Sequence, residues 1–126
     1  MTRFAFVLAL AATPLLAHHS VQAEYDTNHM LTVQGIVTQM QWMNPHAHFW
    51  VETKNDDGSV RTWELELPSP NSLVQSNIRK DFVKPGDRIT VELWPARNGS
   101  SLAHTLSVTR PDGRVLQFPR SWPAER

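Results

Sequence analysis

Short runs of alternating apolar and polar residues, separated by turn-forming residues, fill most of this chain and constrain its fold more than any other feature. Alternation with a period of two is typical of a β-strand that buries one face. Turn signals rich in Gly, Pro, Asn and Asp lie between the runs, most clearly at 55–58, 84–87 and 111–113. The pattern therefore predicts an all-β domain. Its expected strands are 31–42, 47–53, 60–67, 88–94, 102–108 and 115–118.

The first run is long for one strand, and its phase changes part of the way along. Leu31 and Val33 lie on odd positions, whereas Ile36 and Met40 lie on even positions, with Gly35 at the change. A glycine at such a switch predicts a β-bulge. A bulge lets a long strand bend and serve both sides of a small barrel.

One short helix interrupts the strands. Ser69 suits the N-cap of a helix and Pro70 its first position, and we expect the helix to end near Asn77. Three strands with a bent first member, then a helix, then two or more strands, is the element order of a small OB-like barrel with five or six strands. The alternative is a small β-sandwich in which the helix is an incidental connector.

The chain begins with a pattern typical of a secretory signal peptide. Arg3 precedes an apolar run, Phe4–Leu16, that is too short to span a bilayer. Cleavage after Ala17 makes 1–17 the signal peptide, whereas cleavage after Ala23 fits the small-residue rule better. Either cut predicts a periplasmic or secreted protein with no transmembrane span left after cleavage.

Length, charge and cysteine content narrow the class of protein. The 126 residues include no cysteine, which excludes a disulfide or a thiolate site. Removal of Arg3 with the signal lowers the 12 basic side chains to 11, against 12 acidic ones. This balance offers no electrostatic footprint for nucleic acid or anionic lipid. The remaining length suits one apolar core, so we expect a single domain over 18–126, with 119–126 as its C-terminal tail.

Six short motifs occur in order along the chain. They are AHHS at Ala17–Ser20, EYD at Glu24–Asp26, WMNPHAHF at Trp42–Phe49, SPN at Ser69–Asn71, KPGD at Lys84–Asp87 and RPDGR at Arg110–Arg114. In this combination the chain resembles a family of small exported bacterial proteins classed as a domain of unknown function (domain of unknown function 6152). The resemblance implies export and a compact β-rich domain that begins close to the HHS motif, which favours the cut after Ala17. It brings no established activity and no catalytic residues.

A cut after Ala17 makes His18 the first residue of the exported protein. Its free amine and its imidazole then chelate one metal ion near neutral pH, since the ordinary pKa values of these groups are about 8 and about 6.5. His19 offers a second route, through the amine and its own amide nitrogen. His46 and His48 are the candidates from the body of the domain, with Cβ atoms about 7 Å apart when both lie in one strand. Nitrogen ligands in a planar arrangement suit copper(II) first and nickel(II) second.

Each of these histidines also has an ordinary interpretation. HHS is the polar end of a discarded signal when the cut follows Ala23. A histidine beside a turn, such as His46, often only hydrogen-bonds a backbone carbonyl. We expect His29 to face solvent. His104 shares the parity of apolar neighbours in its strand, and we expect it to be hydrogen-bonded and partly buried.

Tryptophans and paired glutamates supply further candidates. Trp63 lies on the apolar parity of its strand, but Trp50 and Trp94 lie on the polar parity. Aromatic side chains exposed on a barrel face bind a sugar, a base or a partner's side chain; alternatively, these two pack beneath the N-terminal segment or the tail. Glu64 and Glu66 share one face, where alternation alone predicts solvated polar residues and acid–base chemistry on a glycoside is the less favoured interpretation.

The sequence favours a binding domain over an enzyme. It contains no Ser, His and Asp arrangement, no glycine-rich phosphate loop and no paired-cysteine motif. The leading hypothesis is an exported, non-catalytic domain that holds copper with its new N-terminus and His46 or His48. The alternative is a module that binds a protein or small-molecule partner through Trp50 and Trp94, without a metal. An enzyme that uses histidine-held copper for redox chemistry ranks third.

Overall fold

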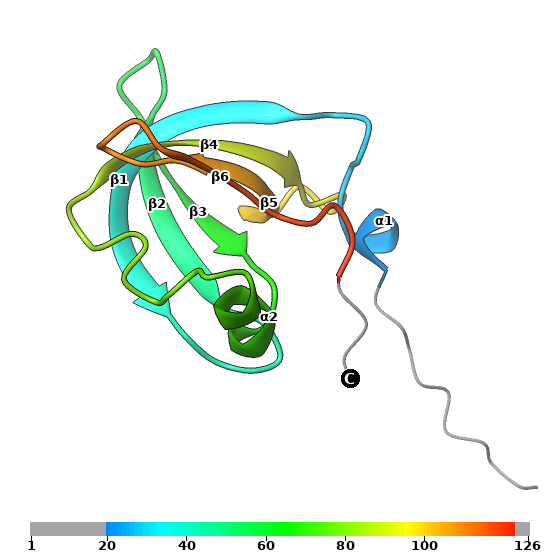
Figure 1. Ribbon diagram of the computed structural model, residues 1–126. Helices are drawn as coiled ribbons and strands as arrows, with labels where there is room; N and C mark the ends of the chain where they lie inside the picture. Colours follow the sequence, from blue (N-terminus) through cyan, green and yellow to red (C-terminus); the bar gives the residue numbers. More distant parts are fainter. Residues whose placement is uncertain (1–19, 123–126) are drawn as a thin grey trace, which may run out of the picture.

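One sheet of six strands closes on itself to form a barrel (Figure 1). The computed structural model describes residues 20–122. Its elements in chain order are α1 (Val21–Glu24), β1 (Leu31–Gln41), β2 (His48–Lys54), β3 (Val60–Glu66), α2 (Pro70–Gln75), β4 (Arg88–Pro95), β5 (Leu102–Thr109) and β6 (Val115–Gln117). The six predicted strands and the helix after the third are confirmed, with ends that differ by a residue or two. The short helix α1 was not predicted.

The barrel closes where β3 pairs with β5. The strand order β3-β2-β1-β4-β5 is completed by a parallel pairing of β3 with β5, in which Glu66 lies opposite His104. The other neighbours pair antiparallel, and β6 adds an extra strand beside β5. This is the OB-like, five-stranded barrel that the element order predicts. The β-sandwich alternative is wrong, because a single closed sheet holds the strands.

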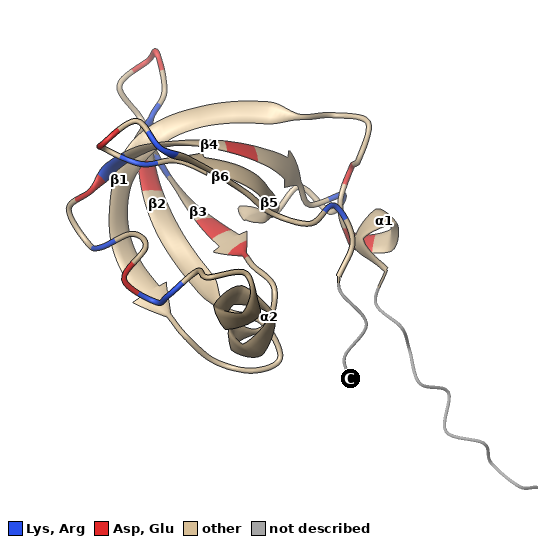
Figure 2. Ribbon diagram, in the orientation of Figure 1, with Lys and Arg blue, Asp and Glu red and all other residues tan. Residues whose placement is uncertain are grey.

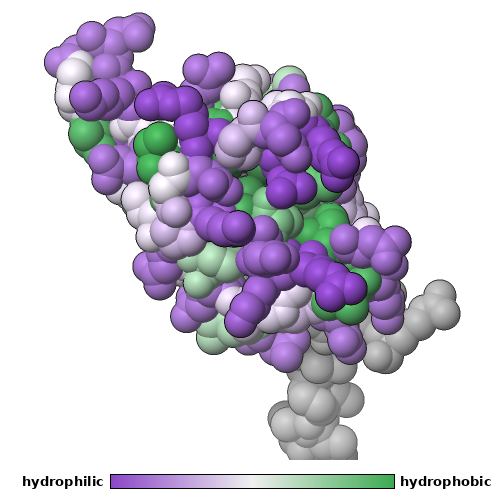
Figure 3. Space-filling view, turned by 60° about the vertical axis from the view of Figure 1, so that its left-hand side comes forward, coloured by the Kyte–Doolittle hydropathy of each residue, from purple (hydrophilic) through white to green (hydrophobic). Residues whose placement is uncertain are grey.

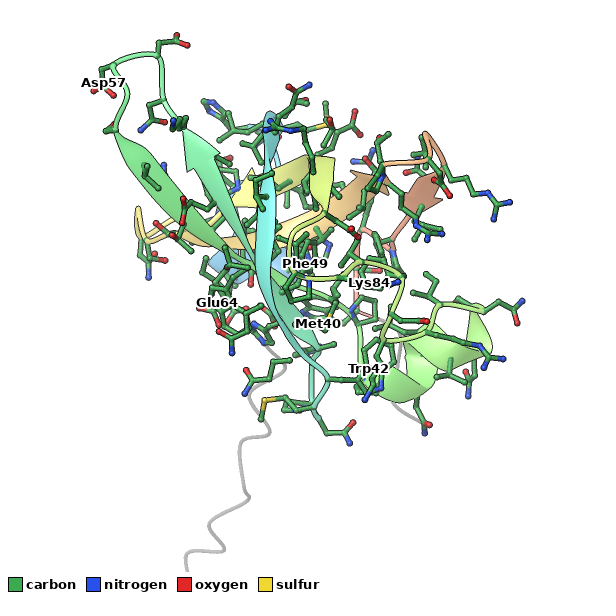
Figure 4. All side chains as sticks on the ribbon, turned by 90° about the vertical axis from the view of Figure 1, so that its left-hand side faces the viewer. Met40, Trp42, Phe49, Asp57, Glu64 and Lys84 are labelled. Carbon is green, nitrogen blue, oxygen red and sulfur yellow. The ribbon has the colours of Figure 1, made fainter. Side chains whose placement is uncertain are left out.

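The interior of the barrel holds one apolar core. The side chains that β2 and β3 direct inward are Phe49, Val51, Trp63 and Leu65, and all four are buried, as alternation predicts. Figure 4 shows Phe49 inside and Glu64 on the other side of the wall. Leu73 of α2 and apolar side chains of the segment 78–83 join the same core and close one end of the barrel.

The bulge in β1 lies later than predicted. The register of β1 with β2 slips between Val37 and Gln39, not at Gly35. Val37 is therefore the core residue, whereas Ile36, which was expected to point inward, is only partly buried. Gly35 serves a close approach instead, because a Cβ atom on it would lie 2.2 Å from the backbone oxygen of Glu52. Only a residue without a side chain fits there.

The helix α2 begins as its sequence predicts. The side chain of Ser69 accepts a hydrogen bond from the backbone N–H of Ser72, and Pro70 opens the helix. The last helical residue is Gln75, two residues before the expected end. Asn77 has a φ of 59°, a left-handed conformation that asparagine tolerates and that ends a helix.

A second apolar cluster lies outside the barrel, against β4 and β5. It joins Val21 and Tyr25 of the N-terminal segment to Trp94 and Leu106, and Trp122 near the end of the chain packs against it. Figure 1 shows α1 and the last described residues side by side in this region. The two ends of the described chain therefore share one packing site.

A second register shift explains which residues of β5 face this outer cluster. The shift lies between Glu92 and Leu93 in the pairing of β4 with β5. Alternation predicted Leu102 and Leu106 on the inner face together with Val108. Only Val108 reaches the barrel core, and both leucines pack in the outer cluster.

Charges of both signs are spread over the surface. Figure 2 shows Lys and Arg interleaved with Asp and Glu along the loops, and acidic residues near the end of β3. On the face shown in Figure 3, polar side chains surround smaller apolar areas. Within residues 20–122, no helix has the length and apolar character needed to cross a membrane.

Gly35→Ala should destabilise the fold by about 2–3 kcal/mol, because the added methyl group meets a backbone oxygen that the β1–β2 pairing holds in place. Gln34→Ala, at the exposed neighbouring position, should change the free energy of unfolding by less than about 0.5 kcal/mol. Urea unfolding of both variants measures the difference. Equal stabilities would contradict the crowding at Gly35.

Candidate functional site

Four side chains form a row on the outside of the barrel at its closing seam. His48 of β2 lies opposite Glu66 of β3. Glu66 in turn lies opposite His104 of β5, which lies opposite Trp94 of β4. Residues directly opposite one another in a sheet point to the same face. This outer row therefore sets two imidazoles, a carboxylate and an indole side by side.

Glu66 is the centre of the outer row. Only 8% of its surface is exposed, and a buried carboxylate is costly without partners. The hydroxyl of Tyr25 donates a hydrogen bond to Oε2 of Glu66, and Nε2 of His46 lies 3.7 Å from Oε1. Burial raises the pKa of Tyr25 above its ordinary value, and the hydrogen bond to Glu66 raises it further, so Tyr25 stays protonated and donates. The expectation of a solvated Glu66 is wrong, because Tyr25 packs against it.

His46 and His48 lie on the same outer face, each beside a glutamate of β3. His46 is not turned away by Pro45, and its side chain keeps 23% of its surface exposed. Nδ1 of His48 lies 3.1 Å from Oε1 of Glu64, an ion-pair distance without the alignment of a hydrogen bond. The side chain of His48 keeps 21% of its surface exposed. Both imidazoles are thus mostly covered but reachable from outside.

His104 is hydrogen-bonded, as expected, but it is more deeply buried than expected, on the outer face of the barrel. It is fully buried, and its Nε2 lies 2.9 Å from the backbone oxygen of Pro119. Burial lowers the pKa of His104 to about 4, so the ring is neutral near pH 7. Nε2 carries the proton, because a backbone oxygen only accepts. This hydrogen bond holds the end of the chain against the outer row.

Residues 119–122, the last that the structure describes, cover part of the outer row. The ring centroid of Trp122 lies 4.2 Å from that of His46 and 4.6 Å from that of His104. The guanidinium of Arg120 lies 5.3 Å from the ring centroid of Trp94. The described part of the expected tail, residues 119–122, is therefore packed against the domain.

Trp50 and Trp94, the two candidates for an exposed aromatic surface, have different environments. Trp94 is only 6% exposed, so the expectation of an exposed side chain is wrong for it. It packs with Val21 and Tyr25 beneath the N-terminal segment, which was the alternative. Trp50 is half-buried, and its ring centroid lies 6.1 Å from that of His48. Of the two, only Trp50 remains a candidate for a surface contact.

Several buried ring nitrogens in this region have no hydrogen-bond partner. They are Nδ1 of His46, His48 and His104, and Nε1 of Trp122. Buried polar atoms without partners are uncommon in folded proteins. Within residues 20–122, however, no group of three or more His, Cys, Asp or Glu is placed to hold a metal ion. His18 and His19, the other two predicted ligands, lie outside the described residues.

Sequence reasoning missed the roles of Tyr25, Glu66 and Trp122. Tyr25 precedes the first strand and belongs to no periodic run. The partners of Glu66 come from segments far away in sequence, which strand alternation does not reveal. The EYD motif is the one sequence signal that could have drawn attention to Tyr25.

Comparison with known proteins places the chain among proteins without an assigned activity. The model of a family of unknown function (DUF6152) matches residues 6–105. No curated protein matches the chain. Among solved structures, the crystal structure of Rim1, a mitochondrial single-stranded DNA-binding protein from S. cerevisiae, is similar at 10% sequence identity and a TM-score of 0.49. The match covers 72% of this chain and 96% of that chain.

The stability of the domain should fall as the pH drops from about 6.5 to about 4. In this range the unfolded chain binds a proton on His104, whereas the folded chain, with a pKa of about 4 at His104, does not. The loss from this group reaches about 3 kcal/mol. Urea unfolding near pH 7 and near pH 4 measures it.

His104→Gln is the matched variant, because its amide keeps a donor for the backbone oxygen of Pro119. The variant should lose this part of the pH dependence, while the part due to other groups remains. The same dependence in the variant and in the unchanged protein would contradict a neutral, buried His104.

Proposed function

We propose that this chain, which belongs to the DUF6152 family of unknown function, is an exported, non-catalytic domain that binds copper(II). One observation supports the proposal. His46 and His48 lie on one outer face of the barrel, each beside a glutamate, and Nδ1 of His46 is buried without a hydrogen-bond partner. An unpaired nitrogen at such a place needs an explanation, and a bound ion supplies one.

The remaining ligands in this proposal come from the N-terminus. Two imidazoles do not complete a metal site, and the part of the chain that the structure describes offers no group of three ligands. Cleavage after Ala17 adds the amine and the imidazole of His18, both of them nitrogen donors. A set of nitrogen donors in a plane suits copper(II).

The N-terminal segment is fastened to the barrel beside these histidines. Tyr25 forms an isolated β-bridge with Ala96. The side chain of Arg97 donates a hydrogen bond to the backbone oxygen of Gln22 at 2.9 Å, and its backbone N–H donates to Glu24. These contacts hold residues 22–25 against the end of β4 and the residues that follow it.

Glu66 links this segment to one proposed ligand. It accepts the hydrogen bond from Tyr25 and also contacts His46. Ser20, the first described residue, follows His18 by two positions, a distance of about 7 Å in an extended chain. Tyr25, five residues after Ser20, brings the same segment to Glu66.

A surface for a protein or small-molecule partner is the second candidate function. Trp50 supports it, because the side chain is half-buried beside His48 on the outside of the barrel. The burial of Trp94 removes the other aromatic side chain on which this candidate depended. That the protein binds no nucleic acid stays a prediction from the balanced charge of the sequence.

Intact mass spectrometry of the exported protein tests the first step of the copper proposal. The expected mass is that of a chain beginning at His18. A chain beginning at Glu24 would lack His18 and His19, and the N-terminal ligands would be withdrawn from the proposal.

Calorimetric titration of copper(II) into the exported protein tests the ligands. His18→Ala, His46→Ala and His48→Ala should each weaken binding by about tenfold or more, because each variant removes a nitrogen donor. His29→Ala is the matched control, since His29 is exposed and should leave the affinity unchanged. If the His46 variant binds copper(II) as tightly as the control, His46 is not a ligand.

A further inference from the structure

The two histidines of the proposed copper site face their glutamates through opposite ring nitrogens. Nε2 of His46 lies 3.7 Å from Oε1 of Glu66. Nδ1 of His48 lies 3.1 Å from Oε1 of Glu64. Two imidazoles on one face thus meet two carboxylates on the neighbouring strand in opposite orientations.

We propose that Glu64 and Glu66 are positioning residues that select opposite tautomers in the two rings, with the proton on Nδ1 in His48 and on Nε2 in His46. The inference rests on the proposed function, because it assigns the nitrogen that each ring offers to a metal. Those nitrogens are Nε2 of His48 and Nδ1 of His46.

The negative charge of each carboxylate determines which ring nitrogen of the facing histidine holds the proton. An ionised carboxylate only accepts hydrogen bonds, so it attracts a ring N–H and repels a ring lone pair. Imidazoles that bind metals commonly direct their other N–H to a carboxylate. An isolated neutral histidine prefers the proton on Nε2. The assignment at His46 therefore follows the ordinary preference, whereas the assignment at His48 depends on Glu64.

The two glutamates differ in how firmly they are held. Oε2 of Glu66 accepts the hydrogen bond from the Tyr25 hydroxyl, which leaves Oε1 for His46, and the residue is nine-tenths buried. The side chain of Glu64 keeps 41% of its surface exposed. Glu64 is therefore the residue to change, because its loss threatens the fold least.

The assignment also has a steric consequence at His46. Its Nδ1 has no exposed surface, so an ion reaches that nitrogen only when a neighbouring group shifts. The ring of Trp122, centred 4.2 Å from the ring of His46, is one neighbour that packs against it.

Long-range proton–nitrogen NMR of the exported protein, ¹⁵N-labelled and free of metal, reads the tautomers directly. At about pH 8, where histidine is ordinarily neutral, we expect an Nδ1–H signal for His48 and an Nε2–H signal for His46. Glu64→Gln should return His48 toward Nε2–H and leave His46 unchanged. Glu52→Gln, which removes an exposed glutamate from β2, is the matched control and should alter neither ring.

An Nε2–H signal for His48 in the unchanged protein would overturn the proposal, and so would an Nδ1–H signal that persists in Glu64→Gln. These spectra need no metal, so they fail separately from the proposed function. If copper(II) binds through His46 and His48 but the spectra show other tautomers, only the positioning role of Glu64 and Glu66 is withdrawn. If the tautomers are as proposed but His46→Ala and His48→Ala leave the copper(II) affinity unchanged, only the copper function is withdrawn. If the tautomers are as proposed and His46 and His48 bind copper(II), Glu64→Gln should weaken copper(II) binding by about tenfold.

Discussion

The parallel pairing of β3 with β5 is the constraint on which the rest of the structure depends. It closes the barrel and sets Glu66 opposite His104 on the outside of the seam. The seam thus carries a carboxylate and an imidazole where an apolar pair would pack with less cost. Glu66 and His104 are buried and need hydrogen-bond partners, and segments outside the barrel strands supply them. The hydroxyl of Tyr25 supplies one partner, and the backbone oxygen of Pro119 supplies another.

Both ends of the described chain are therefore part of the fold rather than appendages. The N-terminal segment reaches the seam through Tyr25, and the C-terminal segment reaches it through Pro119 and Trp122. An outer cluster of apolar side chains fills the space between them. Within this packing, unpartnered nitrogens cost about 1–3 kcal/mol each, and the barrel core needs none of them. A buried polar atom without a partner and without a role in the fold is typical of a functional site, and Nδ1 of His46 therefore supports a ligand at this residue.

The sequence predicted what depends on local pattern and missed what depends on long-range contact. Strand alternation identified Phe49 and Trp63 as core residues, and the N-cap at Ser69 placed the helix, because each follows from neighbours in sequence. The phase change at Gly35 predicts a bulge at the wrong position, because glycine marks both bulges and close contacts and only the pairing with β2 tells them apart. Alternation also predicted a solvated Glu66 and an exposed Trp94. Both are buried because the segments that cover them lie far away in the sequence.

Crystallography of the copper-loaded exported protein, with anomalous diffraction at the copper edge, shows whether His46 and His48 bind copper. We expect one anomalous peak at bonding distance from a ring nitrogen of His46 and of His48, with the terminal amine of His18 as a further ligand. A peak elsewhere on the molecule, with no peak at either imidazole, would contradict it.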